Sequence, residues 1–136
     1  MQCPYCASSS FVTNSRPTAK GTQIWRRREC SRCHGLWSTK EAVDLSKTHV
    51  FISSEGHSEP FSRDALFISL IDSLKHRKTA LNDATAITDT ILSQVLTQKS
   101  AKISRETLIK LVYPTLKRFD KIAAEVYLRT CKAQSS

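Results

Sequence analysis

The feature that most constrains this chain is a pair of Cys-x-x-Cys elements near its start. The first pair is Cys3 and Cys6, the second is Cys30 and Cys33, and 23 residues separate them. Each element supplies two of the four sulfur ligands of a tetrahedral site, and a hairpin can bring the two pairs together around one Zn²⁺. The spacing therefore predicts a structural zinc site with four thiolate ligands.

Other uses of paired cysteines fit less well. Redox motifs usually carry one Cys-x-x-Cys beside a βαβ pattern, whereas this sequence has two such elements close together. Four thiolates leave no open position on the metal, which disfavours hydrolytic zinc chemistry. His34, next to the last cysteine, is expected to be an exposed turn residue. Thiols kept as metal ligands are typical of a reducing compartment, so a cytoplasmic location is predicted, with no membrane segment.

Charge is concentrated in the same part of the sequence. The chain has a formal net charge of +9, and residues 1–47 hold 8 basic and 3 acidic side chains. Residues 23–29 are predicted to form a strand that contains Arg26, Arg27 and Arg28, so arginines project from both of its faces. Residues 14–17 and 20–22 are predicted turns. This pattern suggests a nucleic-acid partner, although a solvated edge strand would show the same charges.

The rest of the sequence predicts a helical domain. Residues 48–60 are expected to form a short hairpin, and four amphipathic helices are expected to follow. Pro114 falls inside the third helix and is expected to kink or split it. Cys131 is expected to be half-buried. The predicted helix-starting residues are Ser62, Asn82 or Asp83, Ser104 and Asp120.

These elements predict an α+β protein with two domains. A small β zinc ribbon would occupy residues 1–47, and a four-helix domain with a short β-hairpin lid would occupy residues 48–136. A segment as short as the ribbon needs a metal to fold. The sequence shows no nucleophile beside a base, no useful carboxylate pair and no glycine-rich phosphate loop, so an enzyme is not expected.

Further motifs run through nearly the whole chain in a recognisable order. They resemble the NrdR family, repressors of bacterial ribonucleotide reductase genes that join a zinc ribbon to an ATP-cone domain. The matching residues are Cys3-Pro-Tyr-Cys6, Ser15-Arg16, Arg26 to Cys33, Thr39, Glu41, Gly56, Glu59-Pro60-Phe61, Leu66, Arg77 and Asp120 to Ala123.

The resemblance implies specific roles. Arg16, Arg26, Arg27 and Arg28 would contact a double-stranded DNA operator. Residues 48–136 would form an ATP-cone-like domain that binds ATP or dATP, and the bound nucleotide would set the arrangement of a homo-oligomer. The residues nominated to line the nucleotide site are Glu59, Arg63 and Arg77.

The sequence departs from the family where phosphates would bind. Ser53 and Ser54 stand where the family usually has Lys and Arg, and Ala65 stands where it usually has Lys. Triphosphate binding depends on such charge-assisted hydrogen bonds. Weak or absent nucleotide binding is therefore predicted, with oligomerisation as the main role of this domain.

Two other functions fit the same residues. The helical domain could dock on ribonucleotide reductase or another protein, with the ribbon as a scaffold. Alternatively, the ribbon could bind single-stranded nucleic acid or RNA, with Trp25 as a stacking platform.

Overall fold

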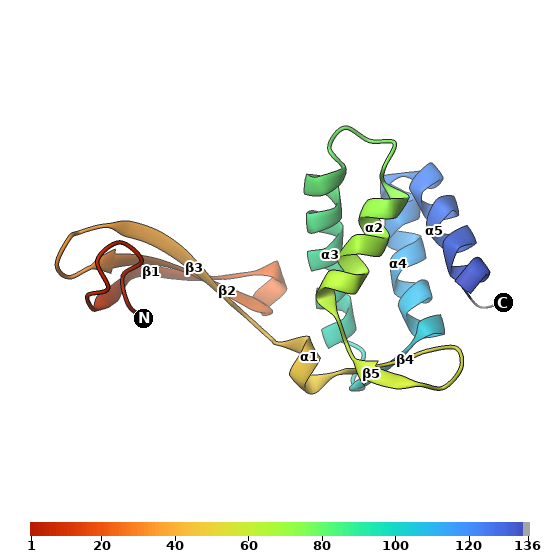
Figure 1. Cartoon of the computed structure of the whole chain (residues 1–136), viewed down its shortest axis with the longest axis horizontal. Helices are drawn as coiled ribbons and strands as arrows, with labels where there is room; N and C mark the ends of the chain where they lie inside the picture. Colours follow the sequence, from red (N-terminus) through yellow and green to blue (C-terminus); the bar gives the residue numbers. More distant parts are fainter. Residues whose placement is uncertain (135–136) are drawn as a thin grey trace. The chain divides into compact units, whose positions relative to one another are not determined.

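The structure, a computed structural model, describes residues 1–134, and the chain divides into two compact units (Figure 1). The first unit is Met1–Val43 and the second begins at Asp44. The boundary thus lies at residue 43 rather than at residue 47. Leu45 explains the difference, because its side chain is only 6% exposed and belongs to the apolar core of the second unit.

The first unit is a three-stranded antiparallel sheet in the order β1-β2-β3. Its elements are β1 (Ser10–Thr18), a 3₁₀ turn (Ala19–Gly21), β2 (Gln23–Cys30) and β3 (Leu36–Ala42). The predicted turn at residues 20–22 and the predicted strand at residues 23–29 are confirmed. The turn predicted at residues 14–17 is wrong, because these residues pair with β2.

The second unit contains a small sheet and four long helices (Figure 1). The hairpin predicted within residues 48–60 is confirmed, since β4 and β5 pair antiparallel. The sequence pattern did not reveal β6, which adds to β4 in parallel. The elements are α1 (Leu45–Thr48), β4 (Val50–Ile52), β5 (Ser58–Pro60), α2 (Arg63–Ser73), α3 (Ala80–Leu96), β6 (Lys102–Ser104), α4 (Arg105–Phe119) and α5 (Lys121–Gln134).

Side-chain caps define where three of the helices begin. Ser62 Oγ accepts from the Ala65 N–H at 3.1 Å, and Ser104 Oγ accepts from the Thr107 N–H at 3.2 Å. Asp120 caps α5 through the Ala123 N–H at 3.0 Å. These three predicted helix starts are confirmed, because each hydroxyl or carboxylate satisfies an otherwise unpaired N–H of a first turn.

Two helix predictions need correction. The second long helix begins at Ala80, before the predicted Asn82 or Asp83. Asp83 is not its cap, because its carboxylate accepts from Thr79 Oγ1 at 2.6 Å and from Arg77 Nε at 2.9 Å. Of the kink or split expected at Pro114, the split is wrong, since α4 continues from Arg105 to Phe119.

The four long helices enclose one apolar core. Its members come from every long helix and from the segments around the small sheet, and most are fully buried. No helix within residues 1–134 combines the length and the apolar character needed to cross a bilayer. The fully buried large side chains include Phe61, Leu70, Leu74, Ile91, Val95, Ile103, Val112 and Leu116.

A polar cluster joins the two corners of the helical bundle. Asp120 Oδ2, at the α4–α5 corner, accepts from His76 Nε2 at 2.8 Å and from Arg77 Nη1 at 3.1 Å, both in the α2–α3 loop. Arg77 also stacks on the Phe119 ring, with its Cζ 4.6 Å from the ring centroid. These hydrogen bonds, His76 first, then that of the Ala123 N–H, lower the pKa of Asp120 to about 2.

Acid should therefore destabilise the helical unit through Asp120. Because the folded-state pKa lies below the ordinary value of about 3.9, the stabilisation is complete above that value and is lost as pH falls toward 2. Replacing Asp120 with Asn should lower stability at neutral pH and flatten the loss between about pH 4 and pH 2. Urea unfolding followed by helical circular dichroism measures both effects; parallel pH curves for the two proteins would contradict this role.

Candidate metal centre and nucleic-acid interface

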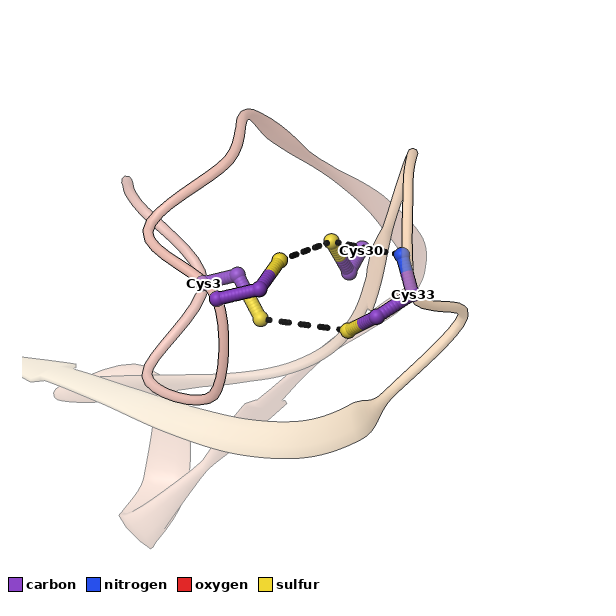
Figure 2. Close-up of side chains that lie close together, drawn as sticks. Cys3, Cys30 and Cys33 are labelled. Carbon is purple, nitrogen blue, oxygen red and sulfur yellow. Dashed lines mark hydrogen bonds between the residues drawn. The ribbon is translucent and has the colours of Figure 1, made fainter.

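The fold brings the four cysteines of the first unit together. Their sulfur atoms all lie within 4.8 Å of one another, with Cys3 Sγ 3.7 Å from Cys33 Sγ and Cys6 Sγ 3.5 Å from Cys30 Sγ. Figure 2 shows sulfur atoms from the N-terminal loop, from the end of β2 and from the turn after it facing a common centre. Four sulfurs bound to one Zn²⁺ at about 2.3 Å would lie about 3.8 Å apart. The cluster therefore fits one structural zinc ion.

Backbone N–H groups point at the sulfur atoms. The Tyr5 N–H donates to Cys3 Sγ at 3.3 Å, and the N–H groups of Arg32 and Cys33 donate to Cys30 Sγ at 3.3 and 3.4 Å. Such bonds favour the thiolate form, which is the form that binds metal. Both Cys-x-x-Cys elements thus have the local geometry that a thiolate–zinc site needs.

Without a cation, the thiols cannot all ionise. Hydrogen bonds from the side chain and backbone of Ser8 lower the pKa of Cys6 to about 6. For Cys33, a backbone hydrogen bond from Gly35 lowers the pKa, but desolvation and the hydrogen bonds of the neighbouring thiols outweigh it and raise the pKa to about 12. A divalent cation removes this conflict, because it compensates the negative charge of the thiolates.

Packing around the cluster fixes the two elements against each other. The Tyr5 hydroxyl donates to the Leu36 carbonyl oxygen at 3.2 Å, and its ring meets Trp37 edge-on at 6.2 Å. Gly35 leaves room for that ring, since a Cβ there would lie 2.5 Å from Tyr5 Cδ2. His34 is exposed, as predicted, and its Nδ1 lies 3.1 Å from Glu29 Oε1.

Loss of one cysteine ligand should release the metal. Replacing Cys30 with Ser should reduce bound zinc from one ion per chain to about a tenth or less, and the ribbon should unfold, because structural zinc contributes about 10 kcal/mol or more to such small folds. Metal analysis by mass spectrometry and proton NMR of the ribbon measure these effects. The matched control is Cys131→Ser, which lies outside the cluster and should keep its zinc; equal metal loss in both variants would contradict the assignment.

One face of the ribbon sheet carries exposed cations. The pairing register places Arg16 and Lys40 opposite Trp25 on its two sides, and Arg27 lies two residues further along the same strand. Arg16, Arg27 and Lys40 are all exposed, and Arg16 Cζ lies 4.7 Å from the Trp25 ring centroid. No carboxylate within residues 1–134 forms an ion pair with these three cations. Lys40 was not nominated from the sequence, because only the strand register reveals its place.

The opposite face holds the other two arginines in cross-strand contacts. Arg26 Nη1 donates to Glu41 Oε2 at 2.9 Å, and Arg28 Nε donates to Thr39 Oγ1 at 3.2 Å. Both side chains are half-buried, unlike Arg27. The two faces therefore differ in how much of their positive charge is available to a partner.

The second unit contains a cavity of about 590 Å³ between the small sheet and the helices. Of the residues nominated for a nucleotide site, Glu59 lines it. Arg63 instead pairs with Asp89 at 3.2 Å, and Arg77 belongs to the Asp83 and Asp120 cluster. The structure thus does not bring the three nominated residues together.

The lining of this cavity is mostly apolar. Its ionisable cationic side chains, among the described residues, are limited to Arg105, and two carboxylates, Glu59 and Asp72, face it as well. Arg105 Nη2 already donates to the Cys131 carbonyl oxygen at 2.8 Å. Half-buried Cys131 also lines the cavity. Such a lining has little charge with which to neutralise a triphosphate.

A closed four-cysteine ribbon joined to a helical unit defines a zinc-ribbon protein. Comparison with known proteins agrees, since the family model described as "Transcriptional repressor NrdR-like, N-terminal domain" matches residues 1–41. Several relatives extend the similarity over most of the chain. Transcriptional repressor NrdR of Geobacillus sp. (strain WCH70) is 34% identical over 90% of this chain and 80% of its own length.

Two further relatives give similar values. Transcriptional repressor NrdR of Alkaliphilus metalliredigens is 33% identical over 90% of this chain and 79% of the relative. The protein of the same name from Pelotomaculum thermopropionicum is 33% identical over 99% of this chain and 84% of the relative. The chain therefore belongs to the NrdR family, whose named members are regulators rather than enzymes.

Proposed function

We propose that this protein is a zinc-dependent transcriptional repressor that binds double-stranded DNA through its ribbon. The observation that carries the proposal is the set of exposed cations Arg16, Arg27 and Lys40 around half-buried Trp25, on one face of the sheet whose strand β2 ends at Cys30. Lysine and arginine side chains on a rigid strand can contact successive phosphates, and arginine can also reach guanine edges. Family membership favours this function over a protein-docking scaffold or a binder of single strands, and it supports action in the cytoplasm.

The two ribbon faces are expected to contribute unequally. Arg16 and Arg27 can meet phosphates without first breaking an ion pair. Arg26 would have to leave Glu41, and Arg28 would have to leave Thr39. We therefore rank Arg16, Arg27 and Lys40 as the main DNA contacts, with Arg26 and Arg28 as supporting residues.

A pair of matched double variants tests this ranking. Replacing Arg16 and Arg27 with Ala should weaken binding to a fluorescent duplex about tenfold or more and should flatten the log–log salt slope by about 2, because two phosphate contacts are lost. Replacing Arg26 and Arg28 with Ala removes the same charge and should cost less. Fluorescence anisotropy at several salt concentrations measures both quantities.

The controls separate folding from DNA contact. Both double variants should keep one zinc per chain, since neither touches a cysteine. Wild-type protein that shows no affinity for duplex DNA would overturn the proposed function. Equal losses in the two double variants would leave the function intact and would show that the ranking of the two faces is wrong.

We further propose that the second unit is an ATP-cone-like domain that serves mainly to form homo-oligomers. Ser53 lines the cavity, and Ala65, where the family usually has lysine, lines it too. Arg105 cannot replace three cations, because it already bonds within the protein. Binding of ATP or dATP is therefore expected to contribute little.

Calorimetry tests whether the protein has lost affinity for ATP and dATP. ATP and dATP, each with Mg²⁺, should show no saturable binding up to about 1 mM, which corresponds to less than about 4 kcal/mol of binding free energy. The variant Ser53→Lys/Ala65→Lys should restore part of the affinity, and light scattering after size exclusion should show an oligomer that nucleotide does not alter. Micromolar binding by the unaltered protein would contradict the proposed loss.

A further inference from the structure

The two corners of the helical bundle carry a set of exposed cations that the ribbon function does not use. The α2–α3 loop contributes Lys75 and Lys78, and the α4–α5 corner contributes Lys117, Arg118 and Lys121, all of them exposed. Figure 1 shows both corners at the same end of the bundle, away from β4 and β5. We call these five residues the basic corner surface.

The polar cluster described above holds the two corners together. Asp120, in one corner, bonds to His76 and Arg77 in the other at 2.8 and 3.1 Å. Lys78 follows Arg77 in the sequence, and Lys121 follows Asp120. Because Arg77 and Asp120 bond to each other, the backbone positions of the two lysines are fixed close together. Preorganised charges of this kind lose less conformational freedom when they bind a partner.

The acidic groups of these corners are turned inward or already paired. The side chains of Asp83 and Asp120 are 17% and 11% exposed, and both bond to Arg77. The exposed Asp72 pairs with Lys75 at 3.0 Å. No carboxylate in the described part of the chain pairs with Lys78, Arg118 or Lys121. The five exposed cations at this end thus outnumber its two exposed carboxylates, Asp72 and Glu125, and Glu125 accepts from the Tyr113 hydroxyl at 2.9 Å.

Helix electrostatics explains some of these cations but not all. Lys117 and Arg118 lie in the last turn of α4, where a cation is favourable. Lys78, in contrast, directly precedes the N-cap of α3, and Lys121 is the first residue of α5. Cations are unfavourable at the positive N-terminal end of a helix, so stability does not account for these two lysines. Their charge adds to that of two helix ends and favours an anionic partner.

We propose that the basic corner surface is a second contact for the phosphate backbone of duplex DNA. The inference rests on the proposed function, because the ribbon in the same chain would hold duplex DNA at high effective concentration. Charge and composition favour DNA over a protein partner: lysine is depleted in protein–protein interfaces, whereas phosphate contacts rely on it. The contact carries no base readout and strengthens binding to any sequence.

The test is a triple substitution in the full-length zinc protein, Lys78→Ala/Arg118→Ala/Lys121→Ala. Its affinity for a mixed-sequence duplex of about 40 base pairs should fall about 10- to 100-fold near physiological salt, and the log–log salt slope should flatten by about 2 to 3. The loss should be the same for every duplex sequence. Anisotropy titrations between low and moderate salt measure these quantities.

A matched variant removes the same charge elsewhere in the second unit. Lys102→Ala/Lys110→Ala/Arg129→Ala changes exposed residues of β6, the first half of α4 and the second half of α5. It should bind duplex DNA almost as well as the unaltered protein. Thermal unfolding gives an independent readout: removing Lys78 and Lys121 from two helix N-termini should offset the loss of Arg118 from the last turn of α4, so the corner variant should be about as stable as wild type.

The possible outcomes are distinct. If wild type binds the duplex and the corner variant binds within about twofold of it, the inference is wrong while the proposed function stands, and the surface belongs to another polyanion such as an acidic protein. If both triple variants lose affinity equally, only the net charge matters, and the inference is again wrong. If wild type itself does not bind duplex DNA, the proposed function fails and the inference fails with it.

A second variant applies if the alanine variant proves unstable. Lys78→Gln/Lys121→Gln, which keeps side-chain length, should reproduce about two-thirds of the change in salt slope.

Discussion

The zinc–thiolate cluster is the interaction on which the ribbon depends. The sheet of the first unit is thin, and Phe11 and Leu36 remain 49% and 47% exposed. Such a sheet buries too little apolar surface to fix its own strands. Four sulfurs on one metal ion tie the N-terminal loop to the end of β2, and Tyr5 packs across the junction. This is why a sequence so rich in exposed arginine can still present its charges from a defined register.

Register also decides which charges matter. In an isolated strand, the three consecutive arginines would differ only in the face from which each side chain projects. Pairing with β1 and β3 gives the two faces different neighbours. On one face Arg26 bonds to Glu41 and Arg28 bonds to Thr39. On the other face Arg27 lies with Arg16 and Lys40. Function in such a ribbon therefore follows from which neighbours each arginine has across the sheet, rather than from the run of arginines itself.

The sequence predicted those features that depend on local chemistry. Cysteine spacing predicted the cluster, and capping side chains predicted where α2, α4 and α5 begin. The sequence did not predict the features that depend on tertiary contacts. Asn14 and Pro17 read as a turn, yet β1 is an edge strand, where proline costs no ladder hydrogen bond if its nitrogen faces outward. The role of Lys40 and the positions of Arg63 and Arg77 could not be predicted, because they depend on strand register and on partners distant in the sequence.

The parallel pairing of β4 with β6 has a consequence for the order of folding. Strand β4 (residues 50–52) cannot pair with β6 (residues 102–104) until the intervening segment, which contains α2 and α3, has been synthesised. Closing so long a loop is entropically costly until those helices have packed, whereas the β4–β5 turn can close locally. The three-stranded sheet is therefore completed late. Since the cavity is lined by Phe51 and Glu59 near this sheet and also by Arg105 of α4 and Tyr127 of α5, a nascent chain completes it only after α5 has left the ribosome.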